Sequence, residues 1–215
     1  MTQKPRVEPV KASGLDDWLS VARGADADEL RERILTGFKG GKPFTPYIPT
    51  VDLPPGPDSV LDFGCGVGRN FPYLQGRARR VYGFDLPPMI ERCRDIAPVT
   101  VNGLWDDWSS VTQQRFDLIF ASLVLQHIEP QACLSYLADF ARLSPLTYLL
   151  TRTTTDFGTN VLDHCVASDA FDMSDCTIVE HDAETNQLKT LGVRPFEELR
   201  RSGDEVHCEL LLRAR

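Results

Sequence analysis

The sequence lacks the features that would place the protein on nucleic acid or around a structural metal. It carries 23 basic residues against 31 acidic ones, a net charge of -8. Its overall field therefore repels a polyphosphate backbone, and we expect no nucleic-acid partner. The six cysteines form no C-x-x-C pair, so the sequence predicts no zinc site, and we expect no other metal.

Long apolar segments are also missing. No run approaches the roughly 18 apolar residues that span a bilayer. The polar N-terminus, MTQKPRVEPVKASG, has no apolar core of the kind found in signal peptides. We therefore expect a cytoplasmic protein without a membrane span, and its oligomeric state stays open.

Length and composition fit one α/β domain. The chain has 215 residues, 42% of them hydrophobic and 25% charged, which suits one sizeable core. We divide it into an N-terminal extension, residues 1–50, and a domain, residues 51–215. The extension contains a predicted amphipathic helix at residues 26–38, where apolar residues recur at helical spacing. A proline-rich connection at residues 42–58 follows it.

Strand and helix patterns alternate after this connection, which predicts a parallel sheet with helices on its faces. Strands are predicted at residues 59–63, 80–84, 99–102, 116–121 and 146–152, and helices at residues 70–74, 88–95 and 130–143. The last third of the chain has predicted helices at residues 160–167 and 195–201, and extended segments at residues 176–181, 187–191 and 205–213.

A glycine-rich turn after the first predicted strand is the strongest local signal. Residues 60–70 read VLDFGCGVGRN, a buried strand that runs into Gly64, Gly66 and Gly68. Glycine has no β-carbon, so the backbone can turn sharply and approach a ligand, while the next helix points free N–H groups into the same crevice. A dinucleotide enzyme would show G-x-G-x-x-G, but Arg69 occupies the third glycine position, which counts against NAD or flavin.

Two carboxylates flank this turn. Asp62, two residues before Gly64, would repel a pyrophosphate and attract an ammonium group. Asp85 ends the second predicted strand in VYGFDLPPMI, where an acid can accept hydrogen bonds from both hydroxyls of a ribose. We interpret Asp85 as a ribose ligand because it is coupled to the glycine turn. A helix N-cap is the alternative.

Together, VLDFGCGVGRN, VYGFDLPPMI and FDLIFASLVLQHIEP resemble the class I S-adenosylmethionine-dependent methyltransferases over roughly residues 59–153. The resemblance implies a Rossmann-like three-layer αβα sandwich. Its mostly parallel seven-stranded sheet would have the order 3-2-1-4-5-7-6, with strand 7 antiparallel, and would carry the N-terminal helical extension here. The implied cofactor is S-adenosylmethionine, which leaves as S-adenosylhomocysteine.

The resemblance also implies which residues contact the cofactor. The glycine turn would line its methionine and ribose groups, Asp85 would hold the ribose hydroxyls, and Leu86 would pack on the adenine. After the third strand the chain departs from the Gly-Asp step that the family often shows, so Leu104 and Trp105 would supply packing and a backbone amide, and Asp106 a polar contact. The full predicted set is Asp62, Gly64, Cys65, Gly66, Gly68, Asp85, Leu86, Leu104, Trp105, Asp106, Ser122 and Leu123.

His127 is the candidate catalytic residue. It could remove a proton from a hydroxyl acceptor as a general base, or it could simply pack at the start of the next helix. Methyl transfer can gain much of its rate from proximity and desolvation, so no dedicated base is required. We expect a transferase that methylates an O or N atom of a small-molecule or glycan-type acceptor. A protein or RNA methyltransferase and a cofactor-binding, non-catalytic partner subunit are the alternatives.

Overall fold

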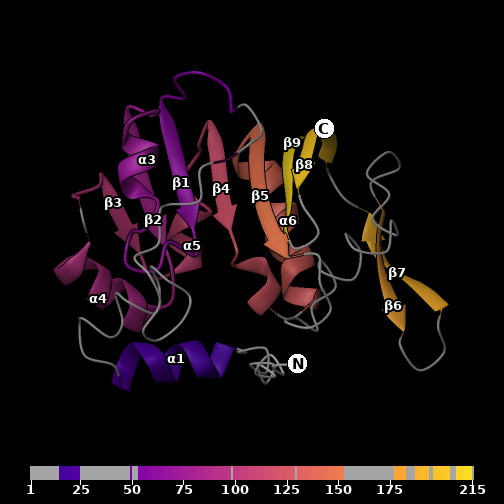
Figure 1. The fold of residues 1–215 in the computed structure, drawn as a ribbon, viewed down its shortest axis with the longest axis horizontal. Coiled ribbons are helices and arrows are strands. Elements are labelled where there is room, and N and C mark those ends of the chain that lie inside the picture. Colours follow the sequence, from indigo (N-terminus) through magenta and orange to yellow (C-terminus); the bar gives the residue numbers. More distant parts are fainter. Residues whose placement is uncertain are drawn as a thin grey trace, which may run out of the picture.

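A seven-stranded sheet forms the centre of the computed structural model, with the strand order β3-β2-β1-β4-β5-β9-β8 (Figure 1). The structure describes residues 15–24, 49, 53–97, 99–128, 130–152, 177–182, 187–193, 196–203 and 207–214. The strands of the sheet are β1 (Ser59–Phe63), β2 (Arg80–Phe84), β3 (Gly103–Trp105), β4 (Leu118–Ser122), β5 (Leu146–Arg152), β8 (Phe196–Gly203) and β9 (His207–Ala214).

Strand direction divides the sheet into a parallel part and an antiparallel edge. β1 pairs in parallel with β2 and β4, and the pairs β2–β3 and β4–β5 are also parallel. β9 runs antiparallel to both β5 and β8. A separate antiparallel pair consists of β6 (Thr177–Asp182) and β7 (Gln187–Val193).

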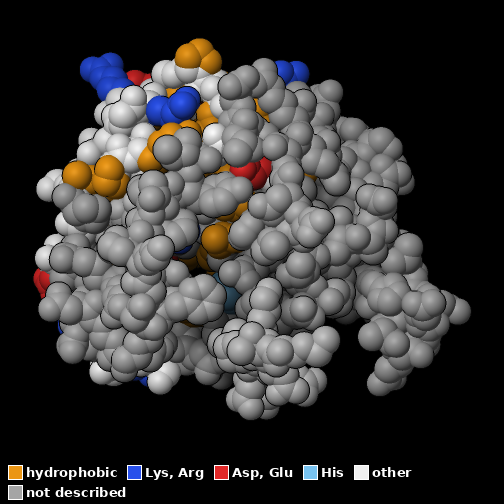
Figure 2. Space-filling view, in the orientation of Figure 1, with side chains coloured by type: hydrophobic (Ala, Val, Ile, Leu, Met, Phe, Trp, Pro, Cys, Tyr) orange, Lys and Arg blue, Asp and Glu red, His pale blue; other side chains and the backbone are white. Residues whose placement is uncertain are grey.

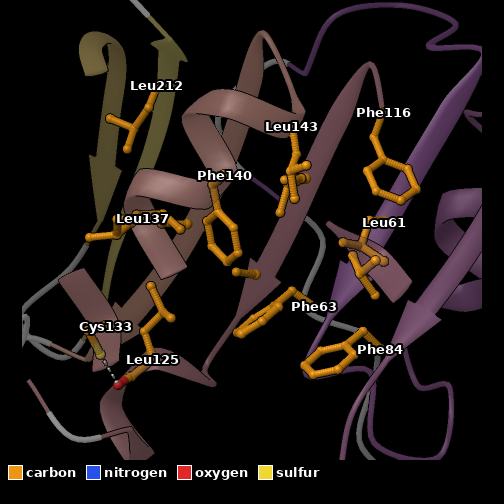
Figure 3. Close-up of a cluster of buried hydrophobic side chains, with 14 of the residues drawn as sticks. Leu61, Phe63, Phe84, Phe116, Leu125, Cys133, Leu137, Phe140, Leu143 and Leu212 are labelled. Carbon is orange, nitrogen blue, oxygen red and sulfur yellow. Dashed lines mark hydrogen bonds between the residues drawn. The ribbon is translucent and has the colours of Figure 1, made fainter. Parts of the chain in front are cut away.

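Helices cover both faces of the sheet, and each face has its own apolar core. On one face α3 (Phe71–Gln75) and α4 (Pro87–Ile96) pack on alternate residues of the strands. On the other face α5 (Trp108–Val111) and α6 (Pro130–Leu143) do so, around Phe63 and Phe140 (Figure 3). The remaining helices are α1 (Leu15–Gly24) and the short 3-10 helix η1 (Leu125–His127). Among the described residues, no helix has the length and apolar character needed to cross a membrane.

The Rossmann-like αβα class predicted from the sequence is confirmed, and the strand order is consistent with the predicted one if β9 is counted as strand 7. The predicted bounds of β1, β2, β5 and α6 coincide with the observed ones. The predicted helices at residues 26–38 and 160–167 lie outside the described residues. The division at residue 50 into an extension and a domain stays a prediction.

Two of the sequence predictions need correction. The helix predicted at residues 195–201 is wrong, because residues 196–201 lie in β8, which pairs with β9. The third strand begins at Gly103 rather than at residue 99. Just before the strand, the side-chain oxygen of Asn102 accepts a hydrogen bond from the Val81 N–H at 2.9 Å. A side-chain oxygen therefore takes the place that a backbone carbonyl would have if the strand pairing continued through residue 102. Helix α1 was not predicted.

Candidate functional site

The candidate site lies where the order of the sheet reverses, between β1 and β4. The chain leaves β1 toward β2 on one side of this point and returns through β4 on the other. In a parallel sheet such a switch point leaves a crevice at the carboxyl ends of the strands, which is where ligands bind. Figure 1 shows α1 below the arrowheads of β1 and β4, on the side of these carboxyl ends.

The turn after β1 is held tightly against β2. The backbone N–H groups of Gly64 and Cys65 both donate to the carbonyl oxygen of Phe84, at 2.8 and 3.1 Å. Gly64 has a φ of +72°, and a β-carbon there would lie 2.3 Å from Cγ2 of Val124, which follows β4. Only glycine fits this position, so the two loops that border the crevice touch at the backbone of Gly64.

Asp85 links the glycine turn to the start of α4. Its Oδ2 accepts a hydrogen bond from the Gly66 N–H and its Oδ1 one from the Leu86 N–H, both at 2.7 Å. Burial raises the pKa of Asp85 to about 6, and the two hydrogen bonds oppose this rise. Leu86 itself is the N-cap residue of α4, which has no side-chain capping bond, so Asp85 is not the N-cap that we considered as the alternative.

Asp62 is a buried carboxyl group at the end of β1 with unused hydrogen-bonding capacity. It is 0% exposed, and burial raises its pKa to about 7, against the opposing effects of Asn70 and the nearby positive charge of Arg69. Asn70 donates to Asp62 Oδ1 at 3.3 Å. Asp62 Oδ2, Asn70 Oδ1 and the hydroxyl of Ser122 are buried and have no hydrogen-bond partner among the described residues. Such atoms are rare in native proteins, so they mark this part of the crevice as a place for a polar ligand.

The segment after β4 has a strained backbone. Leu123 has a φ of +57° and is the only described residue other than glycine with a positive φ. This conformation costs on the order of 1–3 kcal/mol for a bulky side chain. The Leu123 N–H donates to the carbonyl oxygen of Leu150 at 2.8 Å, which fixes the turn against β5. Ser122 and Leu123, both predicted from the sequence, therefore lie at the same crevice as the glycine turn.

The three candidates after β2 lie at the β3 edge and differ in their surroundings. Leu104 packs on the α3 side of the sheet, near Gly83 of β2. The Trp105 ring stacks on Tyr82 at a centroid distance of 5.1 Å, on the opposite side, and only its carbonyl oxygen reaches Asp85, from which it accepts an N–H bond at 3.3 Å. Asp106 is exposed and forms a 3.8 Å ion pair with Arg94.

His127 in η1 contacts α1. Its ring meets the ring of Trp18 edge to face, with centroids 5.5 Å apart. Trp18 also packs against the cluster formed by Ala22, Val67 of the glycine turn and Met89 of α4. Figure 2 shows hydrophobic side chains and a histidine close to one another near the middle of the view. The packing role considered for His127 is therefore observed, which does not exclude a chemical role.

Asn70 also belongs to this site, although the sequence prediction did not assign it as a ligand. Asn70 stands in the glycine motif, at the position before α3, and this could have drawn attention to it. The contacts of Val124 and Trp18 with the glycine turn join distant parts of the chain. Among the described residues no three His, Cys, Asp or Glu side chains form a group that could bind a metal.

Comparison with known proteins adds the family. A family model described as a methyltransferase domain matches residues 25–192. No curated protein is significantly similar in sequence. Similar solved structures include magnesium protoporphyrin IX methyltransferase from Synechocystis PCC 6803 with bound S-adenosylmethionine, at 18% identity over 75% of this chain and 71% of that chain, with a TM-score of 0.46.

Two further similar structures carry different descriptions. The N-methyltransferase NodS from Bradyrhizobium japonicum WM9, in complex with S-adenosyl-L-homocysteine, is 15% identical over 74% of this chain and 79% of that chain, with a TM-score of 0.48. An rRNA methylase from Escherichia coli is 16% identical over 74% of this chain and 58% of that chain, with a TM-score of 0.48. Because the family model matches more than half of the chain, the protein belongs to the methyltransferase domain family and is a class I S-adenosylmethionine-dependent methyltransferase.

Proposed function

We propose that S-adenosylmethionine binds over the glycine turn, across the carboxyl ends of β1, β2 and β4. The observation that carries this proposal is the group of unpartnered buried atoms at the crevice. Side chains alternate along a strand, so Asp62 of β1 and Ser122 of β4 lie on the same face as their neighbours Val60 and Phe120. An ammonium group has three N–H donors and suits two oxygens on this face that lack partners, Asp62 Oδ2 and the Ser122 hydroxyl.

The other contacts follow from the geometry of the turn. Each carboxylate oxygen of Asp85 accepts one hydrogen bond from a backbone N–H. Each oxygen has a further lone pair, and these suit the two hydroxyls of a ribose. Leu86 and Leu104, both partly buried, suit the adenine. The proposed contact residues are those predicted from the sequence: Asp62, Gly64, Cys65, Gly66, Gly68, Asp85, Leu86, Leu104, Trp105, Asp106, Ser122 and Leu123.

In methyl transfer the protein mainly positions the reactants. When bound, S-adenosylmethionine supplies a methyl group on a positively charged sulfur, which the lone pair of an acceptor atom attacks. Trp18 and Ala22 of α1 pack against Val67 of the glycine turn, and this apolar cover would keep water from the region. We propose that His127 accepts the proton of a hydroxyl acceptor, while its contact with Trp18 orients the ring.

We propose an O or N atom of a small-molecule or glycan-type acceptor as the site of methylation. The net charge of -8 disfavours RNA. A protein or RNA acceptor and a cofactor-binding, non-catalytic subunit are the alternatives to be tested. The cytoplasmic location stays a prediction of the sequence.

Thermal unfolding in the presence of ligands tests the cofactor site. A ligand at about one hundred times its dissociation constant stabilises the folded state by about 2.7 kcal/mol. We expect S-adenosylmethionine and S-adenosylhomocysteine to raise the Tm of the wild-type protein, and NAD to leave it unchanged. Asp85→Asn should reduce this rise, whereas Asp139→Asn, a substitution on α6 outside the proposed site, should not. Equal responses of the two variants would contradict the assignment of Asp85.

Transfer of a labelled methyl group tests the acceptor class. The purified protein, S-adenosylmethionine labelled in its methyl group and a fractionated cell extract are incubated together. Label in the small-molecule fraction is the expected result. Label in protein or RNA would favour the corresponding alternative. Binding without any labelled product would favour the non-catalytic subunit, and His127→Gln separates a proton acceptor from a packing residue if it slows transfer without weakening cofactor binding.

A further inference from the structure

Trp18 of α1 carries a hydrogen-bond donor without a partner beside the glycine turn. Its side chain is partly buried, and its indole Nε1 is inaccessible to solvent and has no acceptor among the described residues. The ring packs against the cluster that contains Val67 of the glycine turn, and it also meets the ring of His127 edge to face. The Trp18 ring therefore contacts both the loop after β1 and the segment after β4.

A buried N–H group without an acceptor is unfavourable, so a native protein normally supplies a partner or binds one. The crevice also contains a buried acceptor without a donor, Asp62 Oδ2. A single ligand group can provide a partner for both the indole N–H and this carboxylate oxygen. The α-amino acid part of a ligand carries an ammonium donor and a carboxylate acceptor on the same carbon atom.

We propose that the indole N–H of Trp18 donates a hydrogen bond to the carboxylate of the cofactor's methionine group. The proposal rests on the cofactor site proposed above, because it places the ammonium group at Asp62 and so brings the carboxylate beside it. The contact of Trp18 with the Val67 cluster favours the cofactor over the acceptor molecule as its partner, since Val67 belongs to the glycine turn. A charged acceptor also gives the stronger hydrogen bond.

Calorimetric titration with two ligands tests this assignment. The first is S-adenosylhomocysteine. The second is its decarboxylated form, which keeps the ammonium group and lacks only the carboxylate. The wild-type protein should bind the second ligand about tenfold more weakly than the first. Trp18→Phe, which keeps an aromatic ring and removes the N–H, should bind S-adenosylhomocysteine about tenfold more weakly than wild type and the decarboxylated ligand within about twofold.

Trp108→Phe is the matched control. Trp108 Nε1 donates to Asp139 Oδ2 at 2.8 Å, and its ring packs on the other face of the sheet. This variant should keep the wild-type preference between the two ligands, even if it is less stable.

Two results would overturn the role of Trp18. If Trp18→Phe loses affinity for both ligands equally, Trp18 contributes packing alone. Equal affinity of the wild-type protein for both ligands would exclude a carboxylate contact without recourse to any variant. If the wild-type protein binds neither ligand, the proposed cofactor site itself is wrong, so this failure is distinct from the other two.

Discussion

Asp62 carries a large electrostatic cost in the ligand-free protein, and this cost can be measured. Its pKa rises from 3.8 to about 7, chiefly because the carboxyl group is buried. One pKa unit corresponds to about 1.4 kcal/mol, so ionised Asp62 lowers the free energy of unfolding by up to about 4 kcal/mol. The native state holds the proton more tightly than the unfolded chain, so stability falls as the pH rises from about 4 to about 7.

The substitution Asp62→Asn removes the charge at every pH. The gain in free energy of unfolding over wild type should be near zero at pH 4, grow by about 1.4 kcal/mol per pH unit and level off above pH 7, at up to about 4 kcal/mol. Asp85, with its pKa raised to about 6, contributes a fall of the same sign in both proteins, and its repulsion of ionised Asp62 is a minor part of the Asp62 pKa rise.

Urea denaturation of the ligand-free proteins, followed by circular dichroism at pH 4.5, 5.5, 6.5 and 7.5, measures this difference. Asp106→Asn is the control, because Asp106 is exposed and its ion pair with Arg94 should contribute little at any of these pH values. A difference between Asp62→Asn and wild type that is the same at all four pH values would refute the reasoning.

The other predictions concern binding and packing. Gly64→Ala should lower the free energy of unfolding by about 1–3 kcal/mol, since its β-carbon would meet Val124 and its φ is +72°. The double variant with Val124→Ala should recover the steric part only, and full recovery in urea denaturation would contradict the role of φ. Asp85→Asn should lower the affinity for S-adenosylhomocysteine about tenfold in calorimetry, and an unchanged affinity would mean that Asp85 does not bind the cofactor. Phe63→Ala should cost about 3–5 kcal/mol because Phe63 is 2% exposed and contacts Phe84 and Phe140, whereas a loss under 1 kcal/mol in urea would mean that this core repacks freely.

The sequence by itself determined the elements whose signals are local. β1 and β2 are short apolar runs bounded by turns, and α6 has an apolar face at helical spacing, so their bounds could be read from neighbouring residues. The glycine turn and Asp85 were also recognisable, because the motif places them at the ends of two consecutive strands. These features depend on contacts between residues that are close in the chain.

Only the tertiary structure decided the features that depend on distant partners. Residues 196–201 include glutamate, leucine and arginine, which favour a helix, but pairing with β9 makes this segment a strand. The pKa of Asp62 likewise follows from its burial beside Asn70, and the position of Trp18 over the glycine turn follows from the packing of α1. Burial and pairing are properties of the assembled fold, because the groups that exclude water or complete a sheet come from segments far apart in the sequence.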